Sequence, residues 1–283
     1  MASLRRGLGR IGRTARGLVH ELRGAWRLKA DLRSFGRIAG DLLLFRVIGV
    51  VELPIVNRER TVRIRGSVSL TYRLNRGDIQ SFREVWIEES YLLPFPLTPN
   101  TLVDLGANIG LTSVWLAKRY HCQRLIAVEA SPENARLARL NLAQNGITAE
   151  VISAAVGPHD GTVRFNLHRD SNLGSVDPTG TEVPMISMST LLEKYLPGRV
   201  VDLLKMDIEG GEQALLDGDL GWLRSVHSII AEFHPLAVDY PGLTSRLEHE
   251  GFRYLPANSV HENSMDAFLR PQVRQPTEIT DRA

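Results

Sequence analysis

Apolar positions in the middle of the chain change from a continuous run to helical spacing. Residues 101–105 form a short apolar run that contains one carboxylate, Asp104. From Leu111 onward the apolar residues return every three or four positions, which is the spacing of an amphipathic helix. Small residues, including Gly106 and Gly110, join the two segments. The pattern predicts a buried strand, a tight turn and a helix, which together open a nucleotide-binding α/β domain.

The same alternation of strand and helix continues to about residue 270. Residues 124–130 and 200–207 are apolar runs that predict further buried strands. Ser131 is suited to cap the helix that follows the first of them, and Pro132 is suited to its first turn. Further strands are expected at 149–156, 162–167, 183–188, 226–233, 252–255 and 267–269, and helices at 191–195, 214–216 and 243–250. Alternating elements of this kind predict a doubly wound, Rossmann-like sheet.

The N-terminal part of the chain has a different pattern. Two alternating segments around Gly66 predict a β-hairpin over residues 61–74, and Asp78 is a candidate cap for a helix that runs to Glu89. In residues 1–30 the apolar positions follow helical spacing and arginines fill the other faces. We therefore expect a basic amphipathic extension over 1–60, an α/β domain over 61–270 that begins with the hairpin and helix, and a loose tail over 271–283.

The charge of the chain is unevenly distributed. The 283 residues carry a net charge of +2, but residues 1–50 hold 11 Lys and Arg against 3 Asp and Glu, and the rest hold 23 against 29. Residues 1–35 are thus suited to peripheral contact with an anionic membrane, to an acidic partner, or to packing against the protein itself. No signal peptide or membrane-spanning segment is expected. The single cysteine excludes an intramolecular disulfide and favours a cytoplasmic protein.

Polar side chains at the predicted strand ends indicate which ligand binds. Glu129 lies 19 positions after Gly110, a distance at which an acidic residue can accept hydrogen bonds from ribose hydroxyls. The turn lacks the Gly-x-Gly-x-x-Gly pattern of pyrophosphate sites, because Asn108 replaces the second glycine. Asp104 would repel phosphate and suits a cationic ligand. S-adenosylmethionine carries an ammonium, a sulfonium and a ribose diol but no phosphate, and it is the expected cofactor.

Five motifs, in their order and spacing, carry a family resemblance. They are VDLGANIGLTS, IAVEASPENARLARLNLAQNG, SAAVG, VDLLKMDIEGGEQALL and IIAEFHP. Over roughly residues 75–255 the chain resembles the FkbM family of class I S-adenosylmethionine-dependent methyltransferases. The resemblance implies a seven-stranded sheet with a reversed last strand, and O-methylation as the usual activity. It also implies cofactor contacts: the amino-acid end at Asp104, Gly106, Asn108 and Gly110, the ribose at Glu129, and the adenosine beside Ala130 and Ala155.

Methyl transfer to a hydroxyl group needs positioning and a base. Asp207 and His234 stand at the ends of two predicted strands, and either is a candidate base. Glu209 and Glu232 are candidates for orienting the hydroxyl groups of the acceptor. The four side chains also suit a hard divalent ion. Spacing across two strands does not fix ligand geometry, so no metal is predicted.

Three functions remain open at this stage. The first is O-methylation of a hydroxyl group on a saccharide, a glycolipid or a secondary metabolite. The second is methylation of protein or nucleic acid, although residues 207–210 lack the Pro-Pro-aromatic turn of base amino-methylation and the acidic body disfavours a phosphate backbone. The third is a non-catalytic module that only binds the cofactor. No nucleic-acid partner is expected.

Overall fold

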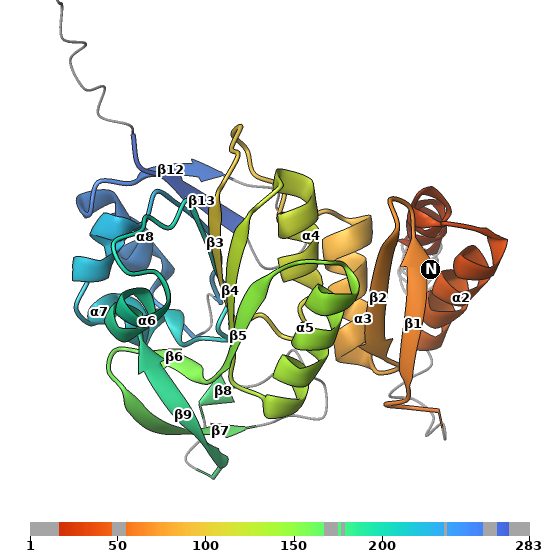
Figure 1. Cartoon of the computed structure of the whole chain (residues 1–283), viewed down its shortest axis with the longest axis horizontal. Coiled ribbons are helices and arrows are strands. Elements are labelled where there is room, and N and C mark those ends of the chain that lie inside the picture. Colours follow the sequence, from red (N-terminus) through yellow and green to blue (C-terminus); the bar gives the residue numbers. More distant parts are fainter. Residues whose placement is uncertain are drawn as a thin grey trace, which may run out of the picture.

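A central seven-stranded sheet organises the molecule (Figure 1). The computed structural model describes residues 17–46, 55–166, 175–176, 179–234, 237–256 and 265–271. The sheet has the order β12-β13-β11-β10-β3-β4-β5, and β13 runs antiparallel to both of its neighbours. The strands are β3 (Thr101–Leu105), β4 (Arg124–Glu129), β5 (Ala149–Ser153), β10 (Leu203–Met206), β11 (Ser228–Glu232), β12 (Arg253–Pro256) and β13 (Met265–Leu269). The expected doubly wound sheet with one reversed strand is confirmed.

Helices cover both faces of this sheet (Figure 1). One face carries α4 (Leu111–Tyr120) and α5 (Pro132–Gln144), and the other carries α6 (Met188–Tyr195), α7 (Glu212–Asp217) and α8 (Tyr240–His249). Strand β3 is buried on both sides because its side chains alternate between the two cores. Leu102 packs in the core that includes α4 and α5, while Val103 and Leu105 pack in the core that includes α6 to α8.

The N-terminal elements pack onto the α4 and α5 side of the sheet (Figure 1). They are a helix over residues 17–28, α2 (Leu32–Phe45), the hairpin β1 (Glu59–Ile64) and β2 (Val68–Arg73), and α3 (Arg76–Phe82). The Tyr72 hydroxyl donates to Asp41 at 2.6 Å, and Asp41 also pairs with Arg60. The side chain of Asn141 on α5 accepts from Thr71 N at 2.7 Å, which ties the hairpin to the sheet domain. Residues 1–16 of the basic leader lie outside the described residues.

Two local expectations differ from the structure. The helix after the hairpin is capped by Asn75, whose side chain accepts from Asp78 N at 2.8 Å, and it becomes π-helical over Arg83–Ile87. Asp78 is not the cap: it is buried and bonded to Arg73 at 2.9 Å, because the hairpin brings that cation beside it. The expected helix over 78–89 is therefore displaced towards the N-terminus.

The second difference is that the strand expected over 149–156 is divided at Ala154. Its first half is β5, and its second half, β6 (Ala155–Gly157), belongs to a four-stranded sheet. That sheet has the order β6-β9-β7-β8 and contains β7 (Gly161–Asn166), β8 (Ser175–Val176) and β9 (Thr181–Ser187). The strand changes sheet because β6 pairs in parallel with β9 instead of continuing along β4. Most of the polar segment 168–182, and the tail from 272, lie outside the described residues.

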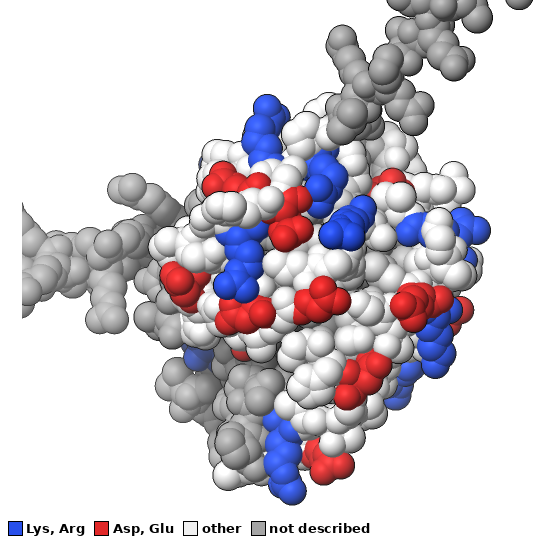
Figure 2. Space-filling view, turned by 90° about the vertical axis from the view of Figure 1, so that its left-hand side faces the viewer, with Lys and Arg blue, Asp and Glu red and all other residues white. Residues whose placement is uncertain are grey.

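The molecular surface opposite the N-terminal elements has a mixed charge. Figure 2 shows that basic and acidic side chains are interspersed over this face, which is the left-hand side of Figure 1 where α7 and α8 lie. None of the helices in the described ranges combines the length and the apolar character needed to cross a bilayer.

Candidate active site

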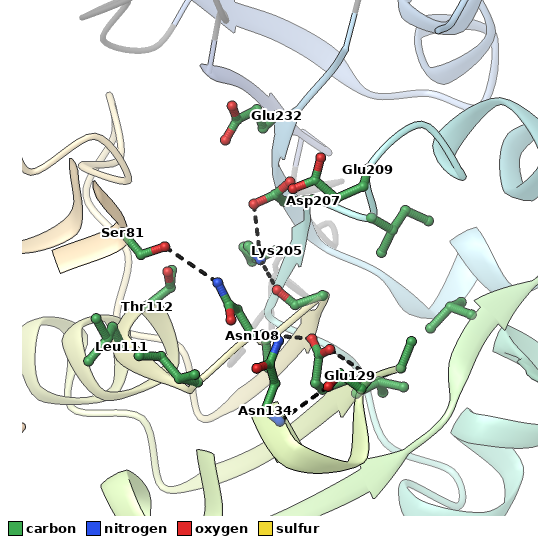
Figure 3. A pocket seen from close by; sticks show the side chains of 18 of the residues that line it. Ser81, Asn108, Leu111, Thr112, Glu129, Asn134, Lys205, Asp207, Glu209 and Glu232 are labelled. Atoms are coloured by element: carbon green, nitrogen blue, oxygen red, sulfur yellow. Dashed lines mark hydrogen bonds and ion pairs between the residues drawn. The ribbon is translucent and has the colours of Figure 1, made fainter. Parts of the chain in front are cut away.

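A cavity of about 410 Å³ lies where the carboxyl ends of β3, β4, β10 and β11 meet (Figure 3). This is the edge at which ligands bind in open α/β sheets. It brings together most of the residues expected from the sequence. Those that line it are Gly106, Asn108, Glu129, Ala130, Ala155, Asp207, Glu209, Glu232 and His234.

The turn between β3 and α4 brings the backbone close to strand β10. Gly106 has a φ of +73°, and a Cβ placed there would meet the carbonyl oxygen of Asp207 at 1.8 Å. Any side chain at this position would push the two strand ends apart. Gly110 begins α4 with a φ of +79° and packs on Ala138. It does not line the cavity, so its role in this structure is to let α4 and α5 approach.

Asp104 lies beneath the turn and not on the cavity wall. Its carboxylate is fully buried, accepts from Ser113 Oγ at 2.5 Å and lies 3.1 Å from Lys205 Nζ. The sequence predicts that this charge faces a cationic ligand. The parallel register places Lys205 directly opposite Asp104 on the neighbouring strand, and the two charges pair inside the protein instead.

Lys205 connects this buried pair to the cavity. Its ammonium donates to the carbonyl of Gly106 at 2.7 Å and lies 3.6 Å from Asp207 Oδ2. Burial disfavours the charged form, but Asp104 and then Asp207 outweigh it and raise the pKa of Lys205. Lys205 is therefore a cation that holds the turn and Asp207 together, and Figure 3 shows it between Glu129 at one end of the cavity and Asp207 at the other.

Glu129 is held at the opposite end from the acidic group around Asp207 (Figure 3). One of its oxygens accepts from Asn108 N and the other from Ser131 N, each at 2.8 Å. Its side chain lines the cavity although the residue is only 8% exposed. Desolvation raises the pKa of Glu129, while the backbone hydrogen bonds act in the opposite direction. Both oxygens are thus oriented by the backbone, which suits a carboxylate that receives a ribose diol.

The other end of the cavity is strongly acidic. Asp207, Glu209 and Glu232 meet there (Figure 3). The buried Tyr91 hydroxyl donates to Asp207 Oδ2 at 3.0 Å and lies 3.5 Å from Glu232 Oε2. Desolvation, followed by the charge of Asp207, raises the pKa of Tyr91 well above its usual range. Tyr91 is therefore a fixed hydrogen-bond donor to the catalytic candidates.

His234 lies between two carboxylates. Its Nε2 is 3.4 Å from Glu209 Oε2, and its Nδ1 is 3.5 Å from Glu212 Oε1. Desolvation would lower the pKa of His234, but the hydrogen bond to Glu212 and the nearby Asp207 and Glu209 raise it to about 9. Glu212 is fully buried and also accepts from Ile208 N at 2.9 Å. His234 is consequently protonated at neutral pH, and the acidic surroundings stabilise that charge.

Glu209 occupies an unusual backbone conformation beside this histidine. Its φ is +55°, in the left-handed region. Desolvation first, and then the charge of Asp207, raise the pKa of Glu209 to about 8. Ligand atoms of Asp207, Glu209 and His234 lie within 4.8 Å of one another, so one divalent ion could reach all three.

Several lining residues were not foreseen from the sequence. Gln80, Ser81 and Glu84 come from α3 and the π-helical turn, and Tyr91 comes from the segment that follows. The apolar face of that helix is recognisable in the sequence. Nothing in the sequence of its polar face indicates that this face lines a cavity at strand ends more than 20 residues away. Asn108 Nδ2 lies 3.4 Å from Ser81 Oγ, while Asn108 Oδ1 is buried and has no hydrogen-bond partner among the described residues. That oxygen is suited to a donor group on a bound ligand.

Comparison with known proteins gives family matches that agree with this geometry. Residues 104–254, more than half of the chain, match the Methyltransferase FkbM domain. Methyltransferase sdnD of Sordaria araneosa is 26% identical over 209 residues, which are 60% of this chain and 80% of the relative. Methyltransferase 1 of Beauveria bassiana (strain ARSEF 2860) is 22% identical over 198 residues, covering 60% of this chain and 79% of the relative.

Among solved structures, a protein of the NADB-Rossmann superfamily from Streptococcus agalactiae is similar with a TM-score of 0.42 and 14% identity. The similar region covers 64% of this chain and 66% of that one, slightly less than two thirds of its length.

Proposed function

The chain belongs to the FkbM methyltransferase family, and on this premise we propose that it methylates a hydroxyl group of a saccharide, a glycolipid or a secondary metabolite. The methyl donor is S-adenosylmethionine. The single observation that carries the choice of a hydroxyl acceptor is the group of carboxylates at the far end of the cavity from Glu129 (Figure 3), with the His234 imidazole 3.4 Å from Glu209. Carboxylates accept hydrogen bonds from hydroxyl groups and can take up their protons.

The residues of the cavity fit this donor. Glu129 would receive the ribose diol, Ala130 and Ala155 would lie beside the adenosine, and Gly106 would leave room at the amino-acid end. The unpartnered Oδ1 of Asn108 is suited to the donor's ammonium group. When bound, the cofactor supplies a methyl group already activated by a sulfonium, so the protein has to position the acceptor and remove one proton.

We assign the proton transfer to Asp207. Its carboxylate lies beside the turn that would hold the donor and is kept in place by Tyr91 and Lys205. With the cofactor bound, it would take the proton of the acceptor hydroxyl, whose oxygen would receive the methyl group that the cofactor supplies. His234, protonated at neutral pH, donates a hydrogen bond to a neighbouring acceptor oxygen. Glu209 and Glu232 orient further hydroxyl groups.

We also propose a cytoplasmic location with peripheral contact at a membrane. The single cysteine supports a reducing compartment, and the excess of basic residues in positions 1–50 supports contact with an anionic surface.

Methyl transfer from labelled S-adenosylmethionine to a panel of acceptors tests the proposed function. We expect label in lipid-linked sugars, free saccharides or polyhydroxylated metabolites. The Asp207→Asn variant should transfer no label, whereas thorough chelation of divalent ions should leave transfer by the unmodified protein intact. Label only in peptides or nucleic acid would overturn the hydroxyl assignment. Cofactor binding by calorimetry without transfer to any acceptor of the panel would indicate a binding module instead. Activity that disappears on chelation and returns with Mg²⁺ would show that Asp207, Glu209 and His234 work through an ion.

A further inference from the structure

Exposed apolar side chains are concentrated on the two N-terminal helices. Among the described residues, six large hydrophobic side chains are exposed, and four of them lie within residues 17–46. These four are Val19 (47%), Trp26 (52%), Leu32 (72%) and Leu43 (47%). A tryptophan and a leucine exposed to this degree on either side of one helix junction need a physical explanation beyond the ordinary scatter of surface apolar residues.

The two most exposed of these side chains flank the junction between the helices. We call this region the basic corner and define it as Trp26, Arg27, Lys29, Leu32, Arg33 and Arg65. Arg65 N donates to the carbonyl of Leu28 at 2.7 Å, so the hairpin turn is part of the corner. The Trp26 ring meets the Phe35 ring edge-on at 5.2 Å and lies under the Lys29 ammonium. This packing holds the indole at the surface in one orientation.

The cations of the corner outnumber the exposed acids beside them. Desolvation and then the charge of Arg65 lower the pKa of Lys29. Asp31 accepts from Ser34 N at 2.7 Å as a helix cap and also interacts with Arg33. Glu59, which lines a surface hollow together with Arg33, pairs with Arg136.

The other two acids of this segment point inward. Glu21 is 5% exposed and pairs with Arg46 at 2.8 Å, and Asp41 is 3% exposed and bonded to Tyr72. The outward charge of the segment is therefore positive.

We propose that the basic corner binds the surface of an anionic phospholipid membrane, with Trp26 and Leu32 entering the interface and the surrounding cations contacting lipid phosphates. Tryptophan is enriched at this depth of a bilayer because its ring is apolar while its N–H remains hydrated. A nucleic acid would satisfy the cations but leave the exposed leucine without an apolar partner. The mixed charge of the face in Figure 2 offers no comparable surface. This inference specifies the peripheral contact proposed above and is independent of the methyl-transfer chemistry.

Point substitutions test this better than truncation. Ala25 and Ile38 are fully buried and Leu42 is 1% exposed, so deleting the helices would expose the core of the protein. The full chain is mixed with vesicles of phosphatidylcholine, with or without about one third phosphatidylglycerol, and bound protein is separated by flotation. We expect binding to the anionic vesicles that falls with added salt. Trp26→Ser combined with Leu32→Ser should weaken it by about tenfold or more.

Matched variants on other surfaces serve as controls. Arg27→Glu with Arg33→Glu should abolish the preference for phosphatidylglycerol, while Arg199→Glu with Arg224→Glu should not. Leu140→Ser with Val200→Ser removes the two large apolar side chains that are exposed elsewhere in the described part of the chain, and it should leave binding unchanged.

Fluorescence gives an independent readout, because Trp26 is the exposed one among the four tryptophans and Trp86, Trp115 and Trp222 are at most 8% exposed. A blue shift on anionic vesicles that is absent in Trp26→Phe is expected. Equal partitioning of the corner and control variants, or binding to nucleic acid but not to anionic vesicles, would overturn the proposal. Methyl transfer to a water-soluble acceptor is measured in parallel, so a failure of lipid binding is distinguishable from a failure of the proposed activity.

Discussion

Glu129 is the residue whose surroundings define a ligand most sharply. Both carboxylate oxygens accept hydrogen bonds from backbone N–H groups. The side chain lines the cavity although the residue is only 8% exposed. A neutral amide cannot accept from both N–H donors and also from the two hydroxyls of a ribose.

Glu129→Gln should therefore weaken S-adenosylmethionine binding by about tenfold or more, since hydrogen bonds to a charged group contribute roughly 1.5–3 kcal/mol. Calorimetry measures the affinity, and unfolding curves check that the fold persists. Glu150→Gln, an exposed change on neighbouring β5, is the matched control and should bind normally. Equal affinities for both variants would remove Glu129 from the ribose site.

A second prediction at this scale separates the roles of Asp207 and His234 by pH. The pKa of His234 is raised to about 9, so the imidazolium persists at neutral pH and is lost as the pH rises through that value. If it acts as a donor, kcat should hold near neutral pH and fall above about pH 9, and His234→Gln should remove that fall. Asp207→Asn should lower kcat by about 10²–10⁴ at every pH, with cofactor affinity retained.

The opposite pH profile would reverse the assignment. A kcat that climbs towards pH 9, and loses that dependence in His234→Gln, would make the histidine the base.

At the scale of elements, the cavity depends on how closely the ends of β3 and β10 approach. The turn after β3 presses Gly106 against the carbonyl of Asp207, and Lys205 bonds the same turn from the neighbouring strand. The catalytic candidate Asp207 is thus positioned by contacts between strands, not by its own loop alone.

Gly106→Ala should destabilise the fold by more than the conformational cost of a left-handed alanine, which is about 1–2 kcal/mol. The added methyl group meets backbone at 1.8 Å, so the strand ends must separate and cofactor binding should weaken as well. Gly66→Ala is the matched control, because its φ is +80° but nothing lies within 4 Å of the added atom. Denaturant unfolding of both variants checks this, and equal losses of stability would contradict the close approach.

At the scale of the whole molecule, the N-terminal elements have two roles. They supply one wall of the cavity through Ser81, Glu84 and Tyr91, and they bear the basic corner on the surface. Their inner side chains pack in one core with α4 and α5, so the basic corner and the cavity belong to a single packed body.

Much of this arrangement was predictable from local pattern. The order of strands and helices, the small-residue turn and the position of Glu129 follow from periodicity and spacing along the chain. The boundary at Ala154 was not predictable, because an apolar run looks the same whether it continues in one sheet or crosses to another. The choice of Asn75 as the helix cap was not predictable, because Asn and Asp have similar intrinsic preferences for the N-cap position. The pairing of Asp78 with Arg73 leaves Asn75 as the cap.

The sequence by itself determined the fold class, the family and the residues at the strand ends, because each depends on neighbours within one or two elements. The tertiary structure decided which charges face the cavity. Asp104 pairs with Lys205, which lies 101 positions away and which the strand register places opposite it. The Tyr91 hydroxyl donates to Asp207, which lies 116 positions away. Such pairings depend on how strands and helices pack, and no local periodicity encodes the relative positions of elements so distant in the chain.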